Sequence, residues 1–201
     1  MSDRDVDGAD PDAGERADQY ACTAAVLDAT PEAAVVTNLG VASYVLAAVA
    51  PDRDRNVYQW GSMGVTTPVG LGLARATDEQ VTVLDGDGSL LMSLGVLSTV
   101  ARYDPDNLVV VVFDNGVYGT TGGQATHSAH TDFAGVAESC GLDAVTVRSD
   151  EAFADAYREA VASSGATLLV CAVDPIDPDA RPPFDFPYIA RTVRNAMTGG
   201  E

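Results

Sequence analysis

The strongest constraint on the fold comes from two uninterrupted apolar runs, VTVL (81–84) and LVVVVF (108–113). Neither run alternates apolar and polar residues, which is typical of strands buried on both faces of a parallel sheet. The segment between them, SLLMSLGVLSTVARY (89–103), has a helical pattern. Strand, helix and strand in this order predict a parallel pair joined by a right-handed crossover.

The same alternation continues along most of the chain and predicts an α/β fold, a parallel sheet flanked by helices. Further helices are expected over 19–29, 41–50, 65–76, 132–141 and 149–164, and further strands over 33–36, 56–60, 144–147 and 167–173. We divide the chain into an acidic leader expected to be disordered (1–18), one domain (19–175) and a proline-rich C-terminal tail (176–201).

Charge is the most unusual feature of the composition, with 30 acidic residues against 11 basic ones and a net charge of −19. All the basic residues are arginine. Like charges at this density repel one another unless salt screens them, so we expect a halophilic protein. No basic stripe is present to neutralise phosphates, which excludes nucleic acid as an expected partner.

The cysteines and apolar segments restrict which metal or disulfide sites and which cellular location we expect. Cys22, Cys140 and Cys171 form no CxxC motif, which argues against a zinc site, an iron–sulfur cluster and a disulfide scaffold. We find neither a signal peptide nor an apolar run long enough to span a bilayer, so we expect no membrane partner and a cytoplasmic location.

Glycine-containing turns follow several predicted strands. They are TNLG (37–40), GSMG (61–64), GDGS (86–89) and DNGVYG (114–119). Ligands of open parallel sheets bind beyond the carboxyl ends of the strands, so we expect these turns to converge. Two common phosphate motifs are excluded, because GxGxxG would need glycine at Leu91 and GxxxxGK[ST] would need lysine.

The GDGS turn combines features of an anion site and a metal site. Gly86 and Gly88 leave backbone N–H groups free at a helix start, and Asp87 offers a hard oxygen ligand for Mg²⁺. Asn115, after the next strand, is placed as a second ligand, with the Val117 carbonyl as a third. The alternatives are a tight surface turn at GDG and a hairpin at the Asn-Gly pair. We interpret Asp85 as a turn residue at a strand end.

The stretch from GDGS to DNG (86–116) resembles the diphosphate-binding motif of thiamine-diphosphate-dependent enzymes, which begins with GDG and ends in an asparagine pair. Asp114 stands at the first position of that pair. The resemblance implies that thiamine diphosphate and Mg²⁺ are cofactors and that Asp87, Asn115 and the Val117 carbonyl hold the metal. The residues implied in diphosphate binding are Gly88, Ser89, Gly119 and Thr120, with clearance at Gly86.

GSMG resembles a second segment of the same family. The resemblance implies that the Gly61 carbonyl, beside Ser62, meets the 4′-amino group of the cofactor, and that Met63 is the apolar wedge behind its bent conformation. Asn38 and Gly40 of TNLG are expected near the pyrimidine or diphosphate.

Within the family, residues 38–64 and 104–127 are similar to sulfopyruvate decarboxylase β subunits and phosphonopyruvate decarboxylases. This similarity implies a 2-oxoacid carboxy-lyase, with a small anionic substrate such as sulfopyruvate, converted to sulfoacetaldehyde and CO₂. The alternatives are another 2-oxoacid decarboxylase, a carboligase of acetolactate-synthase type, and an inactive regulatory subunit.

In this family a glutamate on a separate pyrimidine-binding domain activates the cofactor. Residues 19–175 have room only for the diphosphate-binding domain, so the resemblance implies an α subunit that carries this glutamate, in a hetero-oligomer. His127 and His130 are candidates for a catalytic or anion-binding role, and Gln124 and Thr121 are candidates to contact substrate. Arg102, Arg148 and Arg158 are expected to form surface ion pairs.

Overall fold

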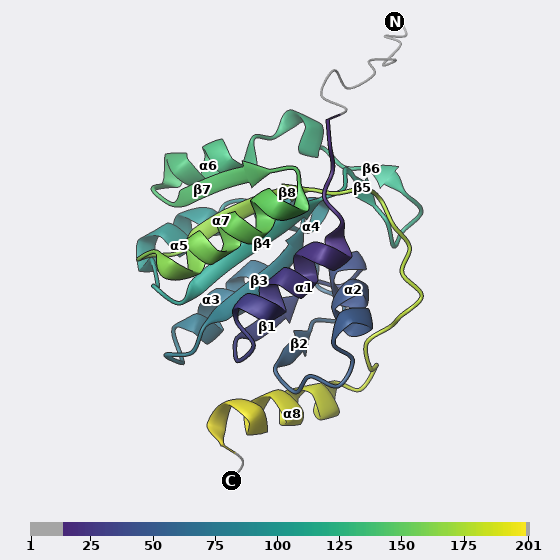
Figure 1. Ribbon diagram of the computed structural model, residues 1–201, viewed down its shortest axis with the longest axis vertical. Coiled ribbons are helices and arrows are strands. Elements are labelled where there is room, and N and C mark those ends of the chain that lie inside the picture. Colours follow the sequence, from purple (N-terminus) through teal and green to yellow (C-terminus); the bar gives the residue numbers. More distant parts are fainter. Residues whose placement is uncertain (1–13, 200–201) are drawn as a thin grey trace, which may run out of the picture.

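A parallel six-stranded sheet forms the centre of the molecule (Figure 1). The computed structural model describes residues 14–199. The sheet order is β2-β1-β3-β4-β8-β7, with every pairing parallel. The strands are β1 (Ala34–Thr37), β2 (Asn56–Tyr58), β3 (Val81–Gly86), β4 (Leu108–Asp114), β7 (Asp143–Val147) and β8 (Thr167–Ala172). The predicted α/β class is confirmed.

Helices cover both faces of this sheet (Figure 1). They are α1 (Gln19–Ala29), α2 (Val41–Val49), α3 (Thr66–Ala74), α4 (Asp87–Leu91), α5 (Val96–Tyr103), α6 (Phe133–Cys140), α7 (Asp150–Ala162) and α8 (Phe186–Thr198). A short hairpin of β5 (Val117–Tyr118) and β6 (Gln124–Ala125) and a 3₁₀ turn (Ser128–His130) lie between β4 and α6. The hairpin follows the Asn-Gly pair, a position where the sequence predicted no matching strand, but β4 itself takes no part in it.

Successive residues of the central strands point to opposite faces and fill two separate cores. In β4, Val109 and Val111 pack with α1, α2 and α7, whereas Val110 and Val112 pack with α3, α5 and α6. Burial on both faces explains why this strand has no polar position before Asp114.

The chain reverses its direction of winding between β1 and β3. After β1 it crosses to β2 at the sheet edge through α2, in one core, and after β3 it crosses to β4 through α4 and α5, in the other. The connections that follow the neighbouring strands β1 and β3 therefore leave in opposite directions. The carboxyl ends of these two strands form a topological switch point, where open α/β sheets bind their ligands.

One predicted helix was wrong in its continuity. The segment 89–103 was expected to be a single helix, but it contains the end of α4, a turn and α5. Met92 and Val96 donate their backbone N–H groups to carbonyls three residues earlier, Ser89 at 3.1 Å and Ser93 at 2.7 Å. This tight bonding replaces the α-helical pattern, in a stretch where Ser93 and Gly95 have low helix propensity.

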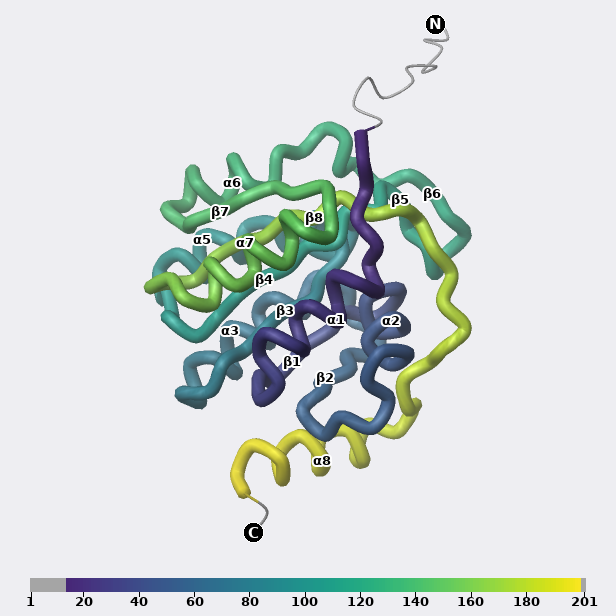
Figure 2. Tube along the Cα trace, viewed as in Figure 1, coloured from purple at the N-terminus to yellow at the C-terminus, as the bar shows by residue number. Residues whose placement is uncertain are grey.

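The C-terminal segment contains a helix that the sequence analysis did not predict. The chain leaves β8, runs past α2 and ends in α8 beside β2, as the yellow end of the tube in Figure 2 shows. Ile189 of α8 is buried. Trp60 Nε1 donates to the Pro183 carbonyl at 2.9 Å, and the Trp60 and Phe184 rings lie 4.9 Å apart.

The predicted disordered leader falls mainly on residues 1–13, which lie outside the described residues. Its last residues are ordered: Ala17 N–H donates to the Ala172 carbonyl at 3.0 Å, and Asp18 caps α1. Across residues 14–199, no helix has the length and apolar character needed to cross a membrane.

Candidate active site

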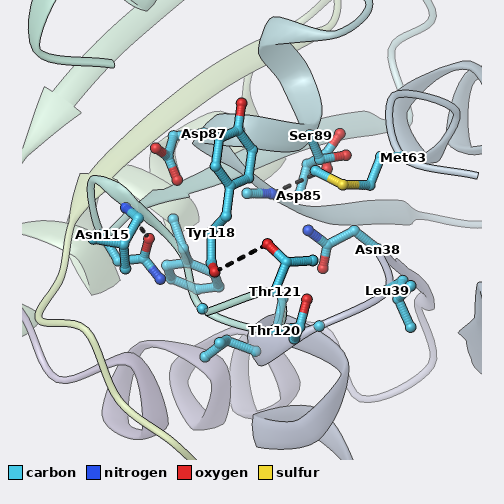
Figure 3. Close-up of a pocket in the computed structure, with 18 of the residues that line it drawn as sticks. Asn38, Leu39, Met63, Asp85, Asp87, Ser89, Asn115, Tyr118, Thr120 and Thr121 are labelled. Carbon is cyan, nitrogen blue, oxygen red and sulfur yellow. Dashed lines mark hydrogen bonds between the residues drawn. The ribbon is translucent and has the colours of Figure 1, made fainter. Parts of the chain in front are cut away.

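Three loops converge at the switch point around one cavity of about 60 Å³. They follow β1, β3 and β4, and are residues 38–41, 86–89 and 115–121. The cavity is lined by Gln19, Asn38, Leu39, Gly40, Val41, Ala42, Met63, Asp85, Gly86, Asp87, Gly88, Ser89, Phe113, Asn115, Val117, Tyr118, Gly119, Thr120 and Thr121. Figure 3 shows Asp87 and Asn115 at one end of this site and Met63 at the other.

Glycine allows these loops to approach closely. A Cβ at Gly88 would overlap the Tyr118 ring and lie 3.0 Å from the Thr126 methyl group. The space beside Gly88 therefore accommodates the β5–β6 hairpin, a packing role beside the diphosphate-binding role that the resemblance implies for this glycine. Gly40 has φ +128°, a conformation that side chains disfavour, and a Cβ there would lie 3.3 Å from Thr120.

Asp87 is a buried acid with a raised pKa that lines the cavity. Its side chain is 2% exposed and accepts a hydrogen bond from the Thr126 hydroxyl. Burial and the nearby Asp114 carboxylate raise the pKa of Asp87 to about 6, against hydrogen bonds from Thr126, Ser128 and the Gly88 N–H that lower it. A buried carboxylate that is costly to ionise alone is stabilised by a cation.

Asp85 has a different role from the one predicted. It lies within β3 and is fully buried, so the interpretation as a turn residue was wrong. Its carboxyl group accepts from the Thr67 hydroxyl at 3.0 Å and from the Gly86 N–H at 3.0 Å. Burial raises its pKa, opposed by a hydrogen bond with Ser89. Asp85 therefore ties the start of α3 to the GDGS turn.

Ser89 also links the GDGS turn to the segment before α3. Its Oγ accepts from the Gly64 N–H at 3.1 Å and also bonds to Asp85. The Ser89 side chain is thus engaged within the protein, and its backbone N–H, at the first turn of α4, is the group left to face an anion.

The loop after β4 is shaped by two side chains that bind their own backbone. Asp114 accepts from the Gly116 N–H at 3.1 Å, and Asn115 accepts from the Val117 N–H at 3.0 Å. These short-range bonds fix the turn that brings Asn115 and Val117 to the cavity. An amide oxygen has two lone pairs, so Asn115 keeps one for a ligand.

Of the GSMG turn, only Met63 lines the cavity. Gly61 and Ser62 lie outside the cavity lining, and both have positive φ, +74° and +59°. A non-glycine residue in this region is uncommon and marks a backbone held by its surroundings. Here Ser89 and Asp85, which bond to Gly64 and Thr67, hold it from one side.

The loop residues predicted to contact substrate divide into two groups. Thr121 lines the cavity, whereas Gln124, His127 and His130 are exposed and do not. Gln124 is bonded within the hairpin, since its Nε2 donates to the Thr121 carbonyl at 2.8 Å.

The arginines named in the sequence analysis lie elsewhere. Arg158 pairs with Asp155 at 2.6 Å on the exposed face of α7, as expected. Arg102 is in the last turn of α5, and neither residue lines the cavity. Arg148 lies in a separate hollow with Arg16 and Asp132.

Several site residues were missed by the sequence analysis. Thr126 and Ser128 support Asp87, and Tyr118, Phe113 and Gln19 line the cavity. Gln19 and Asn38 each have a buried amide oxygen without a hydrogen-bond partner. Thr126 and Gln19 carry no motif in the sequence, because their roles depend on which loops meet in space.

The chemistry of the site suits a hard cation beside an anion. Within the described part of the chain, no cluster of three or more His, Cys, Asp or Glu is placed to hold a metal. A cation here would therefore use Asp87 with amide, backbone and water oxygens, a set typical of Mg²⁺. The unpartnered oxygens and the space between glycine loops fit such a group.

Comparisons with known proteins agree on the family to which this chain is similar. A family model described as "Thiamine pyrophosphate enzyme, C-terminal TPP binding domain" matches residues 36–171. Sulfopyruvate decarboxylase subunit beta of Methanocaldococcus jannaschii is 41% identical over 142 residues, covering 70% of this chain and 75% of that protein. Phosphonopyruvate decarboxylase of Streptomyces viridochromogenes is 43% identical over 170 residues, covering 83% of this chain and 43% of that protein.

Solved structures share the fold. The thiamine diphosphate-dependent 4-hydroxybenzoylformate decarboxylase of Rhodococcus jostii RHA1 superposes with a TM-score of 0.69 at 24% identity, covering 83% of this chain. The match covers 34% of that enzyme, so this chain corresponds to about a third of its length.

Proposed function

The chain belongs to the thiamine pyrophosphate enzymes, as their C-terminal TPP-binding domain, and on this premise we propose that it is the cofactor-binding subunit of a two-subunit 2-oxoacid decarboxylase. The family resemblance expected from the sequence is confirmed. We propose sulfopyruvate as the substrate, with sulfoacetaldehyde and CO₂ as products. Coverage supports the separate subunit, because the match extends over 75% of a sulfopyruvate decarboxylase β subunit but 43% of a phosphonopyruvate decarboxylase. The support for the substrate is that the relatives that are separate β subunits are named for sulfopyruvate.

The observation that carries the proposal is the buried carboxyl of Asp87 beside Asn115 and Val117 at the switch point. These three residues would hold Mg²⁺ through carboxylate, amide and backbone oxygens. The N–H groups of Gly88, Ser89, Gly119 and Thr120 would face the diphosphate. Thiamine diphosphate, when bound, supplies the electron sink for the carbanion that remains after loss of CO₂.

The other end of the site would serve the cofactor's rings. Met63 lies there, at the opposite end from Asp87 (Figure 3). Its flexible apolar side chain suits a supporting contact with a bent ligand, and the Gly61 carbonyl precedes it in the same turn. Asp85 and Ser89 would hold this turn at a fixed distance from the metal end.

A partner subunit is part of the proposal. The relatives with separate chains are named subunit beta, which implies an α subunit. We place the pyrimidine-binding domain and the activating glutamate on that subunit. His127 and Gln124 stay secondary candidates for substrate contact, since neither lines the cavity. A cytoplasmic location and a halophilic source stay predictions.

The test is reconstitution with defined substrates. The chain is purified alone and with a candidate α subunit that carries a pyrimidine-binding domain, and CO₂ release is measured from sulfopyruvate, phosphonopyruvate and pyruvate with thiamine diphosphate and Mg²⁺. We expect turnover of sulfopyruvate by the complex only. Robust turnover by the chain alone would overturn the two-subunit assignment, and preference for phosphonopyruvate would overturn the substrate.

Product analysis addresses the carboligase alternative. With pyruvate as the only substrate, a carboligase releases a condensed hydroxy-keto acid, whereas a decarboxylase releases an aldehyde. An acetolactate product would replace our proposal. A complex that binds cofactor but turns over none of these substrates would favour the regulatory alternative.

A further inference from the structure

The side chain of Gln19 is a buried polar group with no role in the site described so far. It is 3% exposed and lines the cavity, and its Oε1 has no hydrogen-bond partner. A buried amide oxygen without a partner costs about 1–3 kcal/mol. Such a group points to a ligand that supplies the missing donor.

The fold fixes Gln19 in the lining of the cavity that also contains Asp87 and Asn115. The Ala17 N–H donates to the Ala172 carbonyl at 3.0 Å, and the Val173 N–H donates to the Asp114 carbonyl at 3.0 Å. The Ala172–Val173 peptide thus joins Asp114 on one side and Ala17 on the other, so the start of α1 is held across the end of β8 from β4. Cys22 and Val26, one and two turns later, are fully buried and prevent α1 from rotating.

The chemistry of the cavity restricts what the Gln19 oxygen can meet. An amide oxygen only accepts hydrogen bonds. Diphosphate oxygens and the carboxylates of Asp85 and Asp87 are acceptors too, so none of them satisfies it. Mg²⁺ is octahedral, so the three protein ligands and the diphosphate would leave a position for water, and a water bound to a cation is a donor. A cavity of about 60 Å³ has room for more than one water.

We propose that Gln19 is a positioning residue for the metal, whose Oε1 accepts a hydrogen bond from a water molecule bound to the cation. This inference rests on the proposed function. Asn38, whose Oδ1 is also unpartnered and whose side chain is 9% exposed, lies on the loop after β1 and lines the same cavity. Figure 3 shows Asn38 toward the Met63 end, away from Asp87 and Asn115, so the role at the metal is assigned to Gln19 alone.

The test uses Gln19→Met, which keeps the length of the side chain and removes its polar atoms. In the complex with the α subunit and saturating thiamine diphosphate, Mg²⁺ is titrated by calorimetry. We expect Mg²⁺ to bind about 10–100-fold more weakly, the range seen when outer-sphere partners of metal ligands are removed. Gln19→Glu keeps the acceptor and is expected to retain Mg²⁺ binding.

The control is Gln80→Met, at the opposite end of β3, where the Gln80 amide donates to the Val81 carbonyl at 3.1 Å. We expect this variant to bind Mg²⁺ like the wild type. With Mn²⁺ in place of Mg²⁺, water proton relaxation reports how long waters stay on the ion. Gln19→Met is expected to shorten that residence time, an effect that a purely structural role would not produce.

Two outcomes would overturn the inference. One is wild-type Mg²⁺ affinity and water residence in Gln19→Met. The other is an equal loss of unfolding stability in Gln19→Met with and without metal, which would assign Gln19 to a structural water. If the wild-type complex binds neither thiamine diphosphate nor Mg²⁺, the proposed function fails first. If the wild type binds both and Gln19→Met binds them equally, only the role of Gln19 fails.

Discussion

At the scale of single residues, the site depends on polar groups whose burial is unfavourable in the absence of a ligand. Asp87 is the main example, because folding places its carboxyl in a cavity next to Asp114. Its pKa rises from 3.8 to about 6, so the folded chain binds this proton more tightly than the unfolded chain does. The stabilisation from that proton is complete below the unfolded pKa and is lost as the pH rises through about 6.

This sign gives a prediction for Asp87→Asn, which cannot ionise. In the absence of metal, the variant should gain stability relative to the wild type as the pH rises from 5 to 8. A pKa shift from 3.8 to about 6 corresponds to roughly 3 kcal/mol over the whole titration, and roughly half of that difference falls between pH 5 and pH 8. Urea unfolding in EDTA at both pH values measures it.

Magnesium provides the control for that experiment. With thiamine diphosphate present, Mg²⁺ should stabilise the wild type more at pH 8 than at pH 5, because protons compete with the cation for Asp87. The variant should gain little at either pH. Parallel pH profiles for the two proteins without metal would contradict the assigned pKa shift.

Glycine at position 88 gives a second residue-scale prediction. In Gly88→Ala the new Cβ would overlap the Tyr118 ring, so the β5–β6 hairpin must move away from Asp87. We expect a loss of about 1–3 kcal/mol in unfolding free energy and weaker cofactor binding. Gly72→Ala is the matched control, because a Cβ at this position in α3 meets nothing within 4 Å. The control should be neutral or gain up to about 1 kcal/mol from helix propensity, and equal losses in both variants would contradict the steric explanation.

At the scale of elements, the C-terminal segment supports one wall of the site. Phe184 packs on Trp60, which directly precedes the turn that carries Met63, and the Arg181 guanidinium lies 4.0 Å from the centre of the Tyr44 ring on α2. The next element, α8, lies beside the edge strand β2, where an uncovered strand would invite pairing with other chains. The matched family model ends at residue 171, before this segment begins.

Ile189 tests the packing of α8. Its side chain is buried, so Ile189→Ala should lower the unfolding free energy by about 2–4 kcal/mol. Arg191→Ala, on the exposed side of the same helix, should change it little. Thermal or urea unfolding of both variants measures the difference. Equal stability of the two would show that α8 does not contribute to the folded core.

At the scale of the whole molecule, the net charge of −19 dominates. Charges spread over one surface repel each other across a Debye length of about 10 Å at 0.1 M salt, which shrinks to about 3 Å at 1 M. We therefore predict that the melting temperature rises with KCl concentration by at least about 5 °C, corresponding to roughly 1–2 kcal/mol for a domain of this size. Differential scanning calorimetry from dilute buffer to molar KCl measures this change.

A charge variant separates screening from other effects of salt. Replacing exposed Asp52, Asp54 and Asp78 by asparagine reduces the net charge without touching the core. We expect this variant to be more stable than the wild type in dilute buffer and to respond less to KCl. A melting temperature that is independent of salt in the wild type would contradict the expectation of a halophilic protein.

The sequence by itself determined the class of fold and the place of the cofactor loops. Unbroken apolar strands such as LVVVVF can be buried only in a sheet covered on both faces, and β4 is that strand. Turns that follow parallel strands must emerge at the same edge, so GDGS and DNGVYG were expected to meet, and residues of both line one cavity. Local rules sufficed for these features because strand burial and turn position follow from neighbouring residues.

Only the tertiary structure decided which other groups complete the site. Asp85 was interpreted as a turn residue, but its partner Thr67 lies 18 positions earlier, and Thr126 reaches Asp87 from 39 positions later. Gln19 gave no signal, because its place in the cavity lining depends on the pairing of residue 17 with residue 172. Such contacts depend on the order of the strands in the sheet. A pattern of neighbouring residues does not specify that order, so the support of the site became visible only in the folded chain.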